Sequence, residues 1–135
     1  MIMTFGKPRY NSHYDYELLR LCSKRGLQVC GGASKLFSTF VKENPDASVI
    51  SYCNISKFSG DVYTKIGMTL KETTKPAKIW SKDHLYVTDN LLRQRGFDQL
   101  FGADYGTGTS NEELMLQHGW LPVYDCGQAV YEYNK

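Results

Sequence analysis

The apolar positions in the first half of the chain follow two different periods. Short runs rich in β-branched and aromatic residues at 3–5, 14–22 and 47–54 are bounded by turn residues, which predicts three strands. For 14–22 the period alone leaves strand and helix open, and the shortness of the run favours a strand. Between the second and third runs lies a helical stripe that should end at Asn44-Pro45-Asp46. Its members are Ala33, Leu36, Phe37, Phe40 and Val41.

The second half predicts further short elements. Ser59 or Gly60 can cap a short helix that carries Val62, Tyr63 and Ile66, with Gly67 where a C-cap glycine belongs. The pattern then predicts strands at 68–73 and 83–88, helices at 90–101 and 110–119, and a hairpin at 122–133 that turns at Cys126-Gly127.

This order of elements predicts a mixed fold. Strand, strand, glycine turn, helix, strand, short helix and strand follow one another, which is an α/β or α+β plan with helices packed on a mostly β layer. The 135 residues are the length of one domain and contain no repeat or linker. We therefore expect a single domain over residues 1–135, with the hairpin as a C-terminal appendix.

The stretch Leu27–Phe37 (LQVCGGASKLF) places two glycines at the start of the long helix. A helix start exposes unpaired N–H groups and the positive end of the dipole, and glycines let an anion approach them. Gly31 and Gly32 would give that access, while Ser34 and Lys35 could add a hydroxyl donor and a positive charge. Neither G-x-x-x-x-G-K-[ST] nor G-x-G-x-x-G is present, and a tight turn also explains the glycines by backbone conformation alone.

Composition narrows the function classes. Hydrophobic residues make up 41% and charged residues 22% of the chain, and no apolar run approaches the roughly 20 residues of a membrane helix. The N-terminus lacks a signal-peptide pattern, so we expect a cytoplasmic protein without a membrane partner. The four cysteines and three histidines are dispersed, so we expect no metal site.

Charge is distributed unevenly along the chain. Residues 1–42 hold seven Lys/Arg against two Asp/Glu, whereas residues 98–135 hold one against six. A basic portion fits a polyanion such as nucleic acid or the phosphates of a cofactor, and it also fits an ordinary solvated surface.

Two segments in the correct order resemble the GNAT N-acyltransferases. Gln28–Ala33 fits the Q/R-x-x-G-x-G/A pyrophosphate loop of that family, between a strand and an amphipathic helix. About twenty residues later, SYCNISKFSGDVYTKIGM resembles the second GNAT pattern, a strand ending in Asn54, a short helix with Tyr63, and Gly67-Met68. The resemblance implies a GNAT-like mixed sheet flanked by helices.

Two narrower groups are also similar. TFGKPRY, YELLRLCSK, GGASKLF, SVISYCN and GDVYTKIG, in that order, resemble the phage Mom-type DNA adenine modification proteins, which are GNAT-like. The same blocks with VYDCGQAVYEY resemble the C-terminal region of phage homing endonucleases with a Vsr-like nuclease half. No nuclease motif is seen in this chain. The chain departs from the GNAT pattern in beginning near the third strand of that fold. We therefore expect an N-terminally shortened module, or a second subunit that supplies the missing wall of the acceptor site.

The resemblance implies an acyl-CoA site. Acetyl-CoA or a related acyl-CoA would place its pyrophosphate on the loop. Tyr63 would be the acid that protonates the departing thiolate, or a core tyrosine with a hydrogen-bonded hydroxyl. Glu17 is the candidate base, or a solvent-facing strand residue. Asn54 would orient substrate, or satisfy a turn. The expected cofactor-binding residues are Gln28, Val29, Cys30, Gly31, Gly32, Ala33, Ser34 and Lys35.

Cations in the turns around the two N-terminal strands suggest a DNA surface. The expected DNA-binding residues are Lys7, Arg9, Lys24 and Arg25, with Tyr10, Tyr14 and Tyr16 among them. Cations bind phosphates and rings stack an extruded base, although ten tyrosines in the chain make some such adjacency expected by chance.

The sequence thus predicts a phage-related GNAT-like protein that acts on or beside DNA, as an N-acyltransferase-like DNA-modification domain. The alternative is a noncatalytic DNA-binding or accessory module derived from a homing endonuclease. A third hypothesis is structural pairing with an upstream nuclease partner or with a second copy of the chain.

Overall fold

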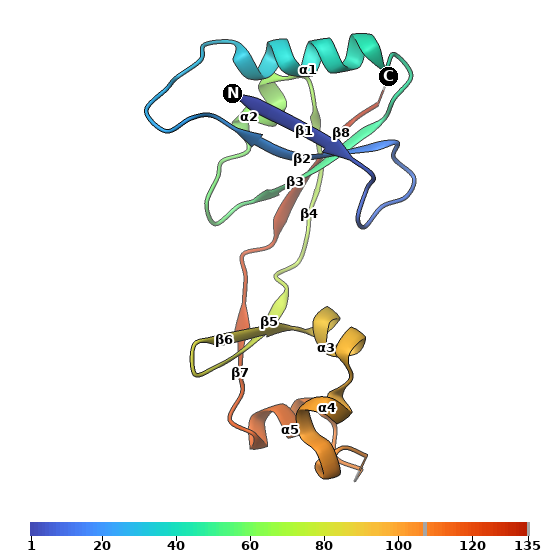
Figure 1. Cartoon of the computed structure of the whole chain (residues 1–135), viewed down its shortest axis with the longest axis vertical. Coiled ribbons are helices and arrows are strands. Elements are labelled where there is room, and N and C mark those ends of the chain that lie inside the picture. Colours follow the sequence, from blue (N-terminus) through green and yellow to red (C-terminus); the bar gives the residue numbers. More distant parts are fainter. Residues whose placement is uncertain (107, 135) are drawn as a thin grey trace. The chain divides into compact units, whose positions relative to one another are not determined.

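A computed structural model describes residues 1–106 and 108–134, and the chain divides into two compact units (Figure 1). Unit 1 comprises Met1–Lys75 and Gly127–Lys135, and unit 2 comprises Pro76–Cys126. Where the sequence analysis expected one domain, each unit has its own sheet and its own hydrophobic core. The architecture is mixed α and β, with two sheets flanked by helices.

Among the described residues, unit 1 contains a five-stranded sheet in the order β1-β2-β3-β8-β4. The β2–β3 pair is parallel, and the other neighbouring pairs are antiparallel. The strands are β1 (Ile2–Gly6), β2 (Tyr16–Cys22), β3 (Val49–Asn54), β4 (Thr69–Thr73) and β8 (Gln128–Tyr133), and the helices are α1 (Gly32–Glu43) and α2 (Asp61–Lys65). These bounds confirm the strands and the two helices that the sequence predicts from residue 2 to residue 73.

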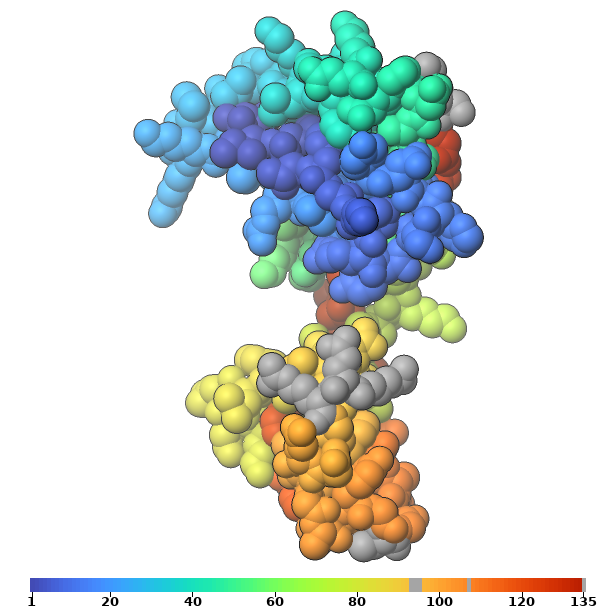
Figure 2. Space-filling view, turned by 45° about the vertical axis from the view of Figure 1, so that its right-hand side comes forward, coloured from blue at the N-terminus to red at the C-terminus, as the bar shows by residue number. Residues whose placement is uncertain are grey.

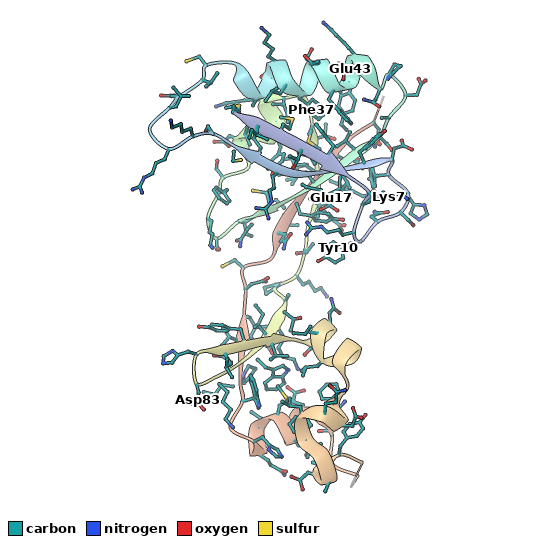
Figure 3. All side chains as sticks on the ribbon, viewed as in Figure 1. Lys7, Tyr10, Glu17, Phe37, Glu43 and Asp83 are labelled. Atoms are coloured by element: carbon teal, nitrogen blue, oxygen red, sulfur yellow. The ribbon has the colours of Figure 1, made fainter. Side chains whose placement is uncertain are left out.

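The core of unit 1 lies between the helices and one face of the sheet. Phe37 of α1 is only 2% exposed and lies between the helix and the sheet in Figure 3. Along β3, Val49 and Cys53 belong to this core, whereas Ile50 and Tyr52 belong to a small cluster on the opposite face. Alternation along a strand sends neighbouring side chains to opposite faces, so β3 has apolar contacts on both.

Unit 2 is inserted in the sequence between β4 and β8. Its described strands form a three-stranded sheet in the order β6-β5-β7, which packs with the helices around Trp80, Leu114 and Met115. The elements are β5 (Lys78–Lys82), β6 (Leu85–Thr88), α3 (Asp89–Arg95), α4 (Phe97–Phe101), the 3-10 helix η1 (Gly102–Asp104), α5 (Asn111–Gln117) and β7 (Leu121–Tyr124).

The helix expected at 90–101 is wrong as a single element, because Gly96 at φ 83° separates α3 from α4. Strand β5 was not predicted. Residue 107, between the two helices predicted at 90–101 and 110–119, lies outside the described residues. The helix predicted at 110–119 is α5, with Ser110 as its N-cap.

The predicted C-terminal hairpin is also wrong. β7 pairs with β5 in unit 2, whereas β8 lies between β3 and β4 in unit 1. The turn signal at Cys126-Gly127 is real, because Gly127 has a φ of 79° and a Cβ there would lie 2.4 Å from the carbonyl oxygen of Thr74. The turn leads into a central strand, because β8 pairs on both edges and is buried on both faces, with Ala129 and Tyr131 in one cluster and Val130 in the other.

Across the described residues, no helix has both the length and the apolar character needed to cross a membrane.

Candidate active site: a gap between two parallel strands

Strands β2 and β3 of unit 1 are paired only at their beginnings. The parallel ladder joins Tyr16 to Val49 and Glu17 to Ile50, and the two strands have no paired residues beyond it. A cavity of about 360 Å³ lies beside the unpaired portions and is lined by both strands, by the loop after β3 and by α2. The lining residues are Leu19, Arg20, Leu21, Cys22, Tyr52, Cys53, Asn54, Phe58, Gly60, Val62 and Tyr63.

The gap offers backbone hydrogen-bonding groups to a ligand. The outer edge of β2 pairs with β1 and the outer edge of β3 pairs with β8, so the two facing edges beyond the ladder are left unpaired with each other. At the closed end, the Ser51 hydroxyl donates to the Leu18 carbonyl across 3.0 Å. An extended ligand that carries amides can bond to such edges as an added strand would.

Tyr63 of α2 lines this cavity and is half-buried. Its ring stacks on Tyr131 of β8 with the centroids 4.8 Å apart. Burial raises the pKa of the Tyr63 phenol, an effect that a hydrogen bond with Ser51 partly opposes. The phenol is therefore protonated at neutral pH and is able to donate a proton into the gap.

The loop between β2 and α1 is exposed from Cys22 to Gly31, and Figure 2 shows it (light blue) at the surface of unit 1. The Gly32 amide donates to Val29 O at 3.2 Å, and the Lys35 amide donates to Gly31 O at 3.0 Å. Within the described part of the chain, the amides of Ala33 and Ser34 have no acceptor. Two bare N–H groups therefore remain at the positive end of a twelve-residue helix.

Local backbone conformation and packing explain why both positions are glycine. Gly31 is the N-cap of α1 with a φ of 67°, and the space around it is open. A Cβ at Gly32 would lie 2.9 Å from Val29 Cγ1, so glycine is needed there for close packing. The turn alone therefore explains the pair of glycines, and the unpaired amides are the feature that bears on anion binding.

The loop and the gap lie at the same edge of the sheet. Parallel strands have their carboxyl ends at one edge, and α1 begins after β2 while the loop that lines the cavity follows β3. Cys22 is both the last residue of β2 and part of the cavity wall. The start of α1 and the open end of the gap can therefore be reached by one elongated ligand.

Asn54 ends β3 and makes a turn. Its side-chain Oδ1 accepts from Ser56 N at 3.0 Å and from Ser56 Oγ at 2.7 Å, and its carbonyl accepts from the amides of Lys57 and Phe58. These hydrogen bonds form a turn, which is the alternative role that the sequence predicts for Asn54. Asn54 also lines the cavity, so a role in orienting substrate stays a prediction.

Glu17 is not a solvent-facing strand residue, because its side chain is only 1% exposed. Glu17 Oε1 accepts from Arg9 Nη2 at 2.6 Å and from Nε at 2.9 Å, and Oε2 accepts from the Arg9 amide at 2.8 Å. Figure 3 labels Glu17 and Tyr10 together below the sheet, on the opposite side from Phe37. The carboxylate is engaged by Arg9 and does not line the gap cavity.

The four cations expected to bind DNA do not form one patch. Lys7 and Arg9 precede β2 in the chain, whereas Lys24 and Arg25 follow it. A strand of seven residues separates the two pairs by about 20 Å. Among the three tyrosines of this region, Tyr10 is 73% exposed, whereas Tyr14 is buried.

A polar network on the same face as Glu17 was missed by the sequence analysis. The Tyr14 hydroxyl donates to Glu132, and Lys71 Nζ donates to the Tyr14 hydroxyl at 2.7 Å. The hydrogen bond from Tyr14 is the main cause of a lowered Glu132 pKa, whereas burial is the main cause of a raised Tyr14 pKa. No local pattern could have indicated it, because residues 14, 71 and 132 meet only through sheet pairing.

A search of the described residues finds no group of three or more histidine, cysteine, aspartate or glutamate side chains placed to hold a metal ion.

No protein-family profile matches this chain, and no curated protein sequence matches it. The geometry and chemistry of the residues are therefore the basis for a functional assignment.

Proposed function

We propose that unit 1 is a GNAT-like N-acyltransferase domain that uses a CoA-type donor. The observation that carries the proposal is the pair of parallel strands that separate next to a helix whose first amides are unpaired. A gap with free backbone edges suits the amide-containing arm of such a donor, and bare helix amides suit its pyrophosphate.

The donor would extend from the helix start into the gap. The amides of Ala33 and Ser34 would hold the pyrophosphate, and the exposed Lys35 would add a positive charge. The arm would run between β2 and β3, so that the thioester lies near Tyr63 at the inner wall. The residues expected at 28–32 would shape this loop without direct contact through their side chains.

The chemistry is transfer of an acyl group to an amine. The amine nitrogen attacks the thioester carbonyl, a C–N bond forms, and the C–S bond then breaks. The nitrogen would lose one proton to solvent, and the departing thiolate would take one from the Tyr63 phenol, which solvent then reprotonates. Unpaired amides at the strand edges of the gap would stabilise the oxyanion.

The proposed acceptor lies on DNA. Unit 1 holds twelve Lys/Arg against seven Asp/Glu, so a polyanion is attracted to it. On the sheet face opposite the helices, Tyr10 meets Tyr52 edge-on at 5.8 Å, and Tyr52 also lines the gap. An exposed ring in contact with a wall residue of the gap is suited to stack a base.

The alternative is a noncatalytic DNA-binding or accessory module. The observation that favours it is that the loop glycines are explained by the turn itself. In that case the gap would be a structural remnant, and unit 1 would bind DNA without binding a donor.

Acetyl-CoA binding to the full-length protein separates the two hypotheses. Ligand that binds only the folded state raises the melting temperature, by an amount that grows with its concentration. We expect a rise with acetyl-CoA and none for Ser34→Glu, which places a carboxylate at the bare amides. Ser34 is exposed, so this change avoids the clash that any side chain at Gly32 would cause.

Ser38→Glu is the matched control, because it adds the same charge at an exposed position one turn further along α1. It should bind acetyl-CoA as the unchanged protein does. If acetyl-CoA at millimolar concentration shifts neither protein, while DNA binding is salt-sensitive, the accessory-module hypothesis is favoured.

A further inference from the structure

Unit 2 contains a pocket that the proposed transfer reaction does not use. It has a volume of about 330 Å³ and lies between β5 and the starts of α3, α4 and α5. Ligand pockets span roughly 300–1,000 Å³, so this one is sized for a single small molecule. Its walls are Lys78, Trp80, Asp89, Phe97, Asn111, Glu112 and Met115.

The floor of the pocket is apolar and rigid. Trp80 is 2% exposed and Met115 is fully buried, and both belong to the core of unit 2. Phe97 is held by stacking between Phe101 and Tyr105, with centroid distances of 6.0 and 6.3 Å. An apolar side chain of a ligand would therefore find a preformed surface.

Charged groups of both signs also line the pocket. Lys78 Nζ lies 3.3 Å from Glu112 Oε1 and 4.8 Å from the centroid of the Trp80 ring. Asp89 Oδ1 accepts the Trp80 indole N–H at 3.0 Å. Among the described residues its other oxygen, Oδ2, has no partner. One cation and two carboxylates thus line a pocket that also carries the Asn111 amide.

We propose that this pocket binds a free α-amino acid with an apolar or aromatic side chain. Lys78 and Asn111 would hold the carboxylate, Asp89 and Glu112 would hold the ammonium group, and the floor would hold the side chain. A zwitterion matches this mixture because each of its charges meets an opposite one, which a simple acid or amine does not achieve.

The ion pair that must open is weak. The Glu112 side chain is 58% exposed, and exposed ion pairs contribute little to stability because solvent screens them. A ligand that inserts its charges next to Lys78 and Glu112 would replace one screened pair by two contacts inside the pocket. The cation over Trp80 is retained in the complex.

Binding can be followed in the full chain by tryptophan fluorescence. The chain has two tryptophans, Trp80 and Trp120, and both lie in unit 2. L-phenylalanine should change their emission with saturation. Phenethylamine, which lacks the carboxylate, and 3-phenylpropionate, which lacks the ammonium group, should each bind about tenfold more weakly or worse, because each loses charge-assisted hydrogen bonds.

Substitution of the cation gives a second test. Lys78→Met keeps an apolar stem over Trp80 and should raise the Kd for L-phenylalanine about tenfold, with no effect on phenethylamine. Lys75→Met is the matched control at an exposed position outside the pocket and should leave both affinities unchanged.

Three results would overturn the inference. One is the absence of saturation at millimolar L-phenylalanine in the folded protein. Another is equal binding of L-phenylalanine and either analogue, which would mean that the charged group missing from that analogue does not contribute to binding. The third is saturation by adenosine in place of L-phenylalanine, which would indicate a nucleobase pocket. The analogue series needs no substitution, so it stands even if Lys78→Met fails to fold.

Discussion

The two units use their sheets in opposite ways. In unit 1 the five-stranded sheet contains a parallel pair that separates after two residues, so a central part of the sheet leaves backbone groups unpaired. In unit 2 all three strands are antiparallel, and β5 is paired on both sides over most of its length. Unit 1 can therefore bind a ligand through its backbone, whereas the pocket of unit 2 is built from side chains.

The units also differ in charge. Unit 1 holds twelve Lys/Arg against seven Asp/Glu, which gives +5, and unit 2 holds four against seven, which gives −3. The overall value of +2 conceals this difference. The positive net charge of unit 1 favours contact with a polyanion, as the proposed function requires, whereas the negative net charge of unit 2 does not.

The largest expected effect tests whether chemistry is confined to unit 1. Tyr63→Phe removes the proposed acid and should lower amine-dependent thiol release from acetyl-CoA by about a hundredfold, the low end of the range for such groups. The measurement is the rate of free thiol formation at saturating donor. Lys78→Met in unit 2 should leave that rate unchanged, and an unchanged rate for Tyr63→Phe would remove this residue from the mechanism.

A smaller effect tests whether the units unfold separately. Arg9→Met leaves Glu17 buried without its partner and should cost unit 1 about 2 kcal/mol, below the 3–5 kcal/mol of fully buried pairs because Arg9 is itself 58% exposed. Denaturant unfolding followed by tryptophan emission reports unit 2 and should not change, whereas far-UV circular dichroism should show an earlier transition.

The corresponding variant in unit 2 is Ser110→Ala. It removes the capping box of α5 and should lower the stability of unit 2 by about 1 kcal/mol. It should shift only the unfolding transition that tryptophan emission reports. A common shift of both signals in either variant would show that the two units unfold as one.

The smallest expected effect is on the pH dependence of the stability of unit 1. Tyr14 lowers the pKa of Glu132 in the folded state, so this group contributes stability that is present above its unfolded pKa of about 4.3. That contribution is lost as the pH falls through the folded pKa. In Tyr14→Phe the Glu132 pKa should rise towards its ordinary value, as measured by NMR titration of its carboxyl carbon. A Glu132 pKa that stays low would assign the shift to Lys71 instead.

Local pattern was sufficient for much of unit 1. The stripe from Ala33 to Val41 predicts α1, and the run 47–54 predicts β3, because burial on one helix face or on both faces of a strand leaves a periodic trace. The run 122–133 contains a real turn signal as well. It could not show that β8 pairs with β3 and β4, since partner choice depends on residues more than fifty positions away.

The candidate site was predictable in part for the same reason. Tyr63 and Asn54 do line the gap cavity, and Ala33 and Ser34 do keep unpaired amides. The wall formed by Leu19, Cys22 and Tyr52 has no motif and arises only when β2 and β3 become neighbours. Glu17 was expected to act as a base or to face solvent, but its partner Arg9 comes from the preceding loop and takes up both carboxylate oxygens.

The sequence by itself determined most of the short strands, the amphipathic helix and the glycine turn in front of it, because these depend on periodicity and on backbone freedom within a few residues. Only the tertiary structure decided that the chain forms two units, that two parallel strands separate to leave a gap, and that Glu17 is buried against Arg9. Those features depend on which distant segments pair and on which charged groups are desolvated. Neither can be predicted from a local stretch of residues.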